Sequence, residues 1–281
     1  MLWNCAACAA ALATLCLVAP AGAFAWGANG HKLISNKAVD TLPPELRPFF
    51  EANRNFIVQH STDPFDALAK NPVAERRNRI LLLDRYGRFP FESLPRDYKA
   101  ALAKFGKARL EANGVLPWQI GVYNEKLTNA LRTRNWEEVR LLAGLVSHYV
   151  AEAHDPFSTT ENFDGKLSGQ PGVNQRFGAS LVDRFSLFFP VRPNDAVYIS
   201  ASYHDQAFEA CLTAHSWLEQ ILLADRRARK GLSDYTDEYY DRFYNQAGAI
   251  VIRQLTDAAT DVGSYWLTAW RNAGQPALPP R

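Results

Sequence analysis

The sequence predicts an all-α protein, folded as a single-domain helical bundle. Long segments repeat apolar residues at helical spacing, runs typical of a strand are scarce, and proline and glycine punctuate the stretches between. The clearest helical segment begins at Trp136, with apolar residues at Val139, Leu142, Leu145, Val146 and Tyr149. Helices of this kind bury one face against each other, which favours a bundle.

Helices are expected, in chain order, at Gly30 to Asp40, Pro44 to Asn53, Asp97 to Ala112, Trp118 to Arg132, Trp136 to Ala153, Gln175 to Phe188, Asp205 to Ala224 and Ser233 to Ala273. Loops containing proline or glycine separate them at Pro72, Pro90 to Pro95, Gly165 to Gly172 and Pro190 to Asn194.

Three of these helices carry further signals. Pro156 ends the fifth helix, because proline cannot continue a helical hydrogen-bond ladder. The basic run Arg226 to Lys230 is expected to be the solvated C-terminal turn of a helix, where positive charge is favourable. The last segment is long enough to contain a break, and Gly248 and Gly263 lie in it.

Residues 1–25 have the pattern of a signal peptide. They contain no charge, run apolar from Ala9 to Val18, and end in Ala23-Phe24-Ala25, a small-x-small cleavage site. Cleavage would leave Trp26 as the first residue of a protein exported to the periplasm or beyond the cell. An uncleaved membrane anchor is the alternative, although the apolar run is short for a span and no later stretch resembles a transmembrane helix. The helical domain would then occupy residues 26–273, followed by a flexible tail over 274–281.

Composition agrees with a folded, exported domain. Hydrophobic residues make up 47% of the chain and aromatic residues 12%, enough for a large core. The formal charge of +2 is close to balance and gives no argument for a nucleic-acid-binding tract. Cys211 is the one cysteine beyond the leader, so no disulfide framework is expected and this side chain should pack as a small apolar group.

The segment from His148 to Ser158 is the most informative for function. Residues four apart share one face of a helix, so His148 and Glu152 can point at the same metal ion. The simpler alternative is a core histidine bonded to a nearby carboxylate. His154 and Asp155 lie beside these positions, so either could reach an altered site. Exposed residues at the helix end are the preferred expectation for both.

The residues at the predicted cleavage site carry a resemblance. Trp26-Gly-Ala-Asn-Gly-His31 and the later His148, Tyr149, Pro156 and Asn162 resemble the zinc-dependent phospholipase C superfamily, which includes secreted fungal single-strand nucleases. The resemblance implies a helical phospholipase C/nuclease-type fold. It also implies three zinc ions that hydrolyse a phosphodiester by activating water and stabilising charge on the phosphoryl oxygens.

The resemblance also implies a set of metal ligands. Trp26, through its amine and carbonyl, and His31 and His148 match ligand positions of the family, and Glu152 stands where the family has a bridging Asp. A further Asp ligand falls near His60 to Asp66. Asp63 is the preferred candidate, and Phe65 is the alternative occupant of that position.

Other ligand positions of the family are replaced. The first histidine of His-x-x-Asp-x-Asp-x-Tyr-Gly is Arg79, a permanent cation that opposes metal binding. The ligands of one whole zinc ion become Ser158, Asn174 and Gly178, which bind zinc poorly or not at all. A three-zinc cluster is therefore not expected. Two outcomes are open: a single zinc ion is retained, or Arg79 replaces a lost zinc by forming a salt bridge to Glu152 or Asp63.

Two functional classes follow. The first is a non-catalytic or repurposed exported protein that kept the fold and binds a ligand, membrane surface or partner. The second is a metal-dependent phosphodiester hydrolase with a reduced site, acting on a phosphodiester substrate or lipid headgroup. The sequence names no catalytic residue and no oligomeric state. Aromatic residues recur at helical spacing at Tyr235, Tyr239, Tyr240, Phe243 and Tyr244. This aromatic stripe is expected to pack in the core, and the alternative is that it forms a surface for lipid or sugar.

Overall fold

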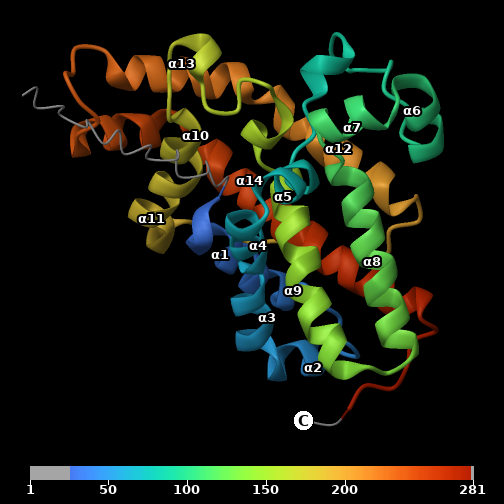
Figure 1. Cartoon of the computed structure of the whole chain (residues 1–281). Coiled ribbons are helices and arrows are strands. Elements are labelled where there is room, and N and C mark those ends of the chain that lie inside the picture. The colour runs from blue at the N-terminus through green and yellow to red at the C-terminus, as the bar shows by residue number, and fades with distance from the viewer. Residues whose placement is uncertain (1–25, 280–281) are drawn as a thin grey trace, which may run out of the picture.

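The computed structural model describes residues 26–279, and every regular element in that range is helical (Figure 1). The all-α class predicted from the sequence is confirmed. The expected signal peptide, residues 1–25, and the last two residues lie outside the described part of the chain.

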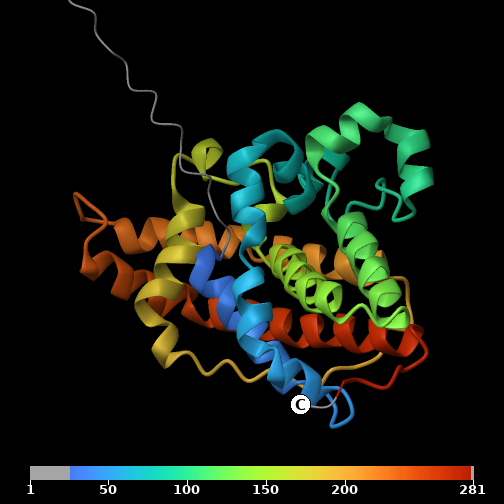
Figure 2. The same cartoon turned by 60° about the horizontal axis from the view of Figure 1, so that its bottom comes forward.

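The centre of the fold is an antiparallel pair of helices packed on a third. Helix α8 (Leu116–Arg132) lies along α9 (Trp136–Ala153), and the two meet the longest helix, α14 (Asp237–Asn272) (Figures 1 and 2). Asn135 caps α9, its side chain accepting a hydrogen bond from the backbone N–H of Glu138. Both ends of α9 fall at the predicted residues, Trp136 and Ala153.

Helix α1 (Gly27–Asp40) packs between α9 and α14 and brings the N-terminal segment into the core. Gly263 lets α14 lie close to Thr41, the residue that follows α1, because a Cβ atom at position 263 would lie 1.9 Å from the Thr41 hydroxyl oxygen. The ring of Phe50 stacks on that of Trp266 with their centroids 4.7 Å apart. Buried apolar residues from Trp26 to Ala269 form one continuous cluster, consistent with a single core.

Four short helices connect α1 to the rest of the fold: α2 (Arg47–Ala52), α3 (Arg54–His60), α4 (Asp63–Lys70) and α5 (Pro72–Arg79). The sequence reasoning missed the last three and placed a loop at Pro72. Pro72 instead begins α5, where a missing N–H costs nothing, and the Asn71 side chain caps the helix by accepting from Ala74 N at 3.2 Å. Tertiary packing holds these helices, which are too short to be stable alone.

Three expected helices are divided in the structure. Gly106, at φ +77°, separates α6 (Tyr98–Phe105) from α7 (Lys107–Asn113), because this backbone conformation suits glycine and ends a helix. The segment expected at Asp205 to Ala224 is α12 (Tyr203–Ser216) followed by α13 (Leu218–Arg229). The segment expected at Gln175 to Phe188 is α10 (Val173–Gln175), a π-helical turn (Arg176–Ser180) and α11 (Leu181–Phe185), followed by a 3₁₀ turn.

Helix α14, by contrast, passes through Gly248 and Gly263 without a break. The run Arg226 to Arg229 forms the last turn of α13, as its charge predicted, and Cys211 is buried in the core. No helix within residues 26–279 is long and apolar enough to cross a bilayer.

Candidate metal centre

Three helices bring four polar side chains together in the interior. His31 comes from α1, Arg79 from the last residue of α5, and His148 and Glu152 from the C-terminal half of α9. Each is almost fully buried: Arg79 is 5% exposed, Glu152 1% and both histidines 0%. The shared face of His148 and Glu152 follows from their four-residue spacing, whereas His31 and Arg79 reach them only through packing.

The two histidines are held in a parallel stack, with ring centroids 4.2 Å apart and planes inclined by 11°. His148 Nδ1 lies 2.8 Å from the Ser61 carbonyl oxygen, which can only accept, so Nδ1 carries the proton. Its Nε2 therefore presents a lone pair to the cluster when the ring is neutral. Nε2 of His148 and Nε2 of His31 each lie 3.5 Å from Oε1 of Glu152.

Glu152 is bonded through both carboxylate oxygens. Arg79 Nε donates to Oε1 at 2.9 Å, and a second guanidinium nitrogen, Nη2, makes a short contact with the same oxygen. The Ser158 hydroxyl donates to Oε2 at 2.8 Å. The salt bridge that the sequence suggested as one outcome for Arg79 is thus confirmed, and its partner is Glu152.

Burial and the neighbouring cation set the protonation of this cluster. Burial alone would raise the pKa of Glu152, but Arg79, with smaller contributions from the two histidines, holds that pKa well below its ordinary value. Burial lowers the pKa of His31 and, more strongly, that of His148. Glu152 is therefore ionised and both imidazoles are neutral near neutral pH, so Arg79 supplies the charge that balances the carboxylate.

Phe65 of α4 faces this cluster, and Asp63 does not. The Phe65 ring meets His31 and His148 edge to face, with centroids 5.2 Å from each, and the Arg79 guanidinium carbon lies 4.8 Å from its centroid. Asp63 instead contacts His60 Nδ1 at 2.5 Å, with its side chain 41% exposed. An aromatic ring thus lies against the histidines where the sequence preferred a carboxylate.

Trp26 lies at the N-cap of α1, five residues before His31. Its buried indole donates from Nε1 to the Ala151 carbonyl at 2.9 Å, and its own carbonyl accepts from Gly30 N at 3.2 Å. The indole thus fixes the start of α1 against the end of α9, the two helices that supply His31, His148 and Glu152.

Ser158, Asn174 and Gly178, where the resemblance implied the ligands of one whole zinc ion, lie in or beside the protein interior. Ser158 Oγ also lies 3.1 Å from Asp155 Oδ2, and both residues are buried. Burial, followed by the nearby Glu152 charge, raises the pKa of Asp155 to about 7. Asn174 is 3% exposed, and Gly178 lies in the π-helical turn. None of the three replaced positions offers a strong zinc donor.

The expectation that His154 and Asp155 are exposed was wrong. His154 is 5% exposed and Asp155 is fully buried. His154 Nε2 lies 3.1 Å from Asp261 Oδ2, and the His154 carbonyl accepts from Gln254 at 2.7 Å. Helix α14 covers this end of α9, an arrangement that spacing along α9 alone does not reveal.

Three of these side chains could provide part of the coordination shell of one metal ion. Ligand atoms of His31, His148 and Glu152 all lie within 4.8 Å of one another, and the two Nε2 atoms make no hydrogen bond in this structure. Two imidazoles and a carboxylate are a donor set that suits zinc. However, Arg79 bonds the carboxylate oxygen nearest to both histidines, so an ion at this position would have to displace the guanidinium.

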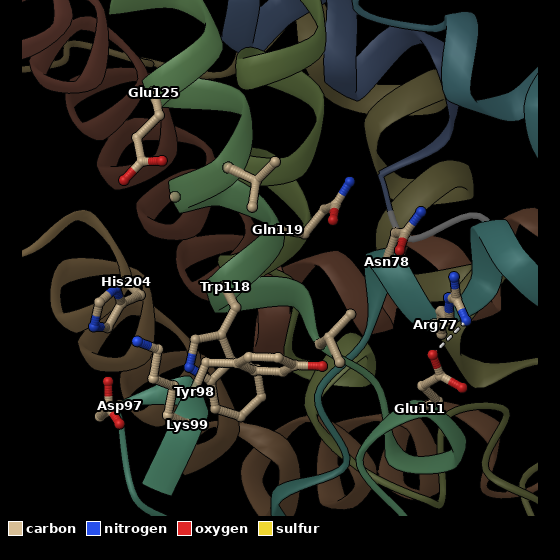
Figure 3. A pocket seen from close by; sticks show the side chains of 13 residues that line it. Arg77, Asn78, Asp97, Tyr98, Lys99, Glu111, Trp118, Gln119, Glu125 and His204 are labelled. Atoms are coloured by element: carbon tan, nitrogen blue, oxygen red, sulfur yellow. Dashed lines mark hydrogen bonds and ion pairs between the residues drawn. The ribbon is translucent and has the colours of Figure 1, made fainter. Parts of the chain in front are cut away.

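A separate cavity of about 470 Å³ lies over α8, beside the ends of α5 and α6 (Figure 3). Tyr98 and Trp118 provide aromatic surface, and Arg77 bonds Glu111 at 2.8 Å at one side. Its lining includes none of the four residues of the buried cluster. The charges around it are of both signs, and they favour no single class of ligand.

No protein-family model matches the chain, and no curated protein matches it either.

Proposed function

We propose that this protein is an exported member of the zinc-dependent phospholipase C/nuclease type in which an internal ion pair replaces the three-zinc centre. In this proposal it does not hydrolyse phosphodiesters by the three-zinc reaction and serves a binding role. The single observation that carries the proposal is the contact of Arg79 with Glu152, the carboxylate that both histidines face.

The physical reason lies in charge balance. Metal ions would neutralise a buried carboxylate such as Glu152, and a guanidinium provides the same compensation while staying protonated at all working pH values. A zinc ion and Arg79 would compete for Oε1, and their like charges repel. Phe65 adds an apolar surface against the histidines, where another carboxylate would favour a cation.

The second candidate is a metal-dependent phosphodiester hydrolase with a reduced, single-ion site. It is supported by the converging donors of His31, His148 and Glu152. In that case the bound ion would supply a Lewis acid and an activated water. The residues of this chain would orient it: the Ser61 carbonyl fixes the tautomer of His148, and Ser158 holds the second oxygen of Glu152.

Metal analysis of the chain that begins at Trp26 separates the two candidates, combined with assays on phosphatidylcholine vesicles, single-stranded DNA and bis(p-nitrophenyl) phosphate. We expect less than one zinc per chain and no turnover that depends on zinc. Three tightly bound zinc ions would refute the proposal. Zinc-dependent turnover that disappears in His148→Ala would instead establish the hydrolase.

A further inference from the structure

A second cavity, of about 460 Å³, lies at the C-terminal end of α13, and four of the five charged residues that line it are cationic. Its walls come from the loop at Gly169 and Gln170, from the last two turns of α13, and from Tyr235 just before α14. Figures 1 and 2 place this end of α13 and the following turn (orange) at one extremity of the molecule. The lining shares no residue with the buried histidine cluster.

Four of the five residues from 226 to 230 are cationic, and all four line this cavity: Arg226, Arg227, Arg229 and Lys230. The acidic residue in the lining is Asp225, whose side chain is 2% exposed. Three groups already bond its carboxylate: Arg176 at 2.9 Å, Gln170 at 2.6 Å and the Tyr239 hydroxyl at 2.5 Å. Asp225 is therefore unable to neutralise the cations that face solvent.

The carboxylates of the next segment, Asp234, Asp237, Glu238 and Asp241, form no ion pair with Arg226, Arg227 or Lys230. Asp237 is bonded by Arg184 at 2.6 Å, and Glu238 by Arg242 at 2.5 Å. Arg229 donates to the Ser233 carbonyl at 2.6 Å. Within residues 26–279, the side chains of Arg226, Arg227 and Lys230 make no hydrogen bond or ion pair. Three uncompensated cations thus converge on one cavity.

The helix dipole explains only part of this arrangement. Positive side chains near a helix C-terminus are favourable, and this accounts for the sign of the charge on the last turn of α13. It does not account for a cavity beside them, nor for apolar surface inside it. Leu223 is 38% exposed, and the Tyr235 ring lies under the guanidinium groups of Arg176 and Arg229, at 3.9 and 4.8 Å from its centroid.

We propose that this cavity binds a small organic anion that carries a phosphate or sulfate group. Arg226, Arg227 and Lys230 would contact the oxyanion through charge-assisted hydrogen bonds, which are strongest from guanidinium groups. The apolar part of the ligand would lie against Leu223 and Tyr235. The volume suits a small molecule and is at the lower end of the range for ligand pockets, so a polymer is not the expected occupant.

Phenyl phosphate is the probe for this site, with inorganic phosphate, phenyl sulfate and the neutral benzyl alcohol beside it. Isothermal titration calorimetry on the chain from Trp26 should give saturable binding of phenyl phosphate with a Kd below about 1 mM. Inorganic phosphate should bind more weakly, and benzyl alcohol should not bind. Raising the salt concentration should weaken binding, since exposed charges are screened.

The triple variant Arg226→Gln, Arg227→Gln, Lys230→Gln should lose about tenfold or more in affinity, because each lost contact is a hydrogen bond to a charged group. The matched control, Lys70→Gln, Arg88→Gln, Lys99→Gln, removes the same charge from exposed positions elsewhere and should stay within about twofold of the wild type. All six positions are exposed, so both variants should keep the wild-type circular dichroism spectrum.

Either of the following two results would overturn the proposal, and so would a third, from heparin. One is the absence of saturable binding of phenyl phosphate or phenyl sulfate by the wild-type protein. The other is an equal loss of affinity in both triple variants, which would mean that net charge, and not this cavity, attracts anions. Heparin that binds more tightly than phenyl phosphate, with an equal loss of affinity in both variants, would indicate a diffuse surface for polyanions and no specific site.

Discussion

The imidazole rings of His31 and His148 stack with centroids 4.2 Å apart, and both direct Nε2 toward Oε1 of Glu152 at 3.5 Å. Two stacked imidazoles repel each other if both are protonated, and burial already lowers the pKa of each. The charge opposite Glu152 is therefore Arg79. We therefore expect both the stability of the centre and its affinity for metal to depend on that guanidinium.

Glu152→Gln should destabilise the protein by about 3–5 kcal/mol, because it leaves the buried Arg79 without the carboxylate that neutralises it. Urea unfolding followed by circular dichroism measures the loss. The double variant Arg79→Met, Glu152→Gln is the control and should be more stable than Glu152→Gln, since it removes the uncompensated cation as well. Equal stability of Glu152→Gln and the wild type would show that the ion pair does not stabilise the fold.

Arg79→His should increase zinc binding. The change removes a permanent cation and places a fourth donor beside His31, His148 and Glu152, the number that tetrahedral zinc prefers. Equilibrium dialysis followed by metal analysis should approach one zinc per chain. Arg77→His, on the same helix and in a partly exposed ion pair with Glu111, is the matched control and should leave zinc content unchanged. If the wild type already binds zinc as tightly, Arg79 does not oppose the metal.

Asp155→Asn should change how stability depends on pH. The pKa of Asp155 is raised to about 7, so between its ordinary pKa and this value the folded protein holds a proton that the unfolded chain has lost. This group therefore reduces stability as pH rises from about 4 to about 7, by at most about 1.4 kcal/mol per pH unit. Asparagine cannot lose that proton.

The unfolding free energy of Asp155→Asn, minus that of the wild type, should accordingly increase as the pH rises from 5 to 8. All other ionisable groups are the same in both proteins, so the difference in unfolding free energy isolates Asp155. Asp66→Asn, at an exposed position, should show no such trend. A constant difference across this range would mean that Asp155 is ionised throughout.

Tyr239→Phe should cost about 1–3 kcal/mol of stability. The hydroxyl donates to Asp225 at 2.5 Å and accepts from Arg176 Nε at 3.1 Å, both within a buried network that joins α13, α14 and the π-helical turn. Tyr240→Phe is the control, because the hydroxyl of this half-buried residue makes no hydrogen bond within residues 26–279, and the change should alter stability by less than about 0.5 kcal/mol. Similar thermal unfolding of the two variants would contradict this role for Tyr239.

The prediction from sequence succeeded where one long segment carried its own signal. Apolar spacing and Pro156 together predicted the two ends of α9. Two of the five residues of the aromatic stripe, Tyr239 and Phe243, are buried as expected, and the other three are half-buried. The prediction failed over α3, α4 and α5, which are each eight residues or fewer. Helices of that length show too few apolar repeats to be recognised, and packing against α1 and α9 stabilises them.

The sequence by itself determined the helical class and placed His148 and Glu152 on one face, because helix geometry depends on neighbouring residues. It also identified Arg79 as a cation at a position that opposes metal. Only the tertiary structure decided that Arg79 bonds Glu152, a residue 73 positions away, and that Phe65 rather than Asp63 faces the histidines. Contacts between distant segments depend on how the helices pack, and no local pattern encodes the angle or the register of that packing.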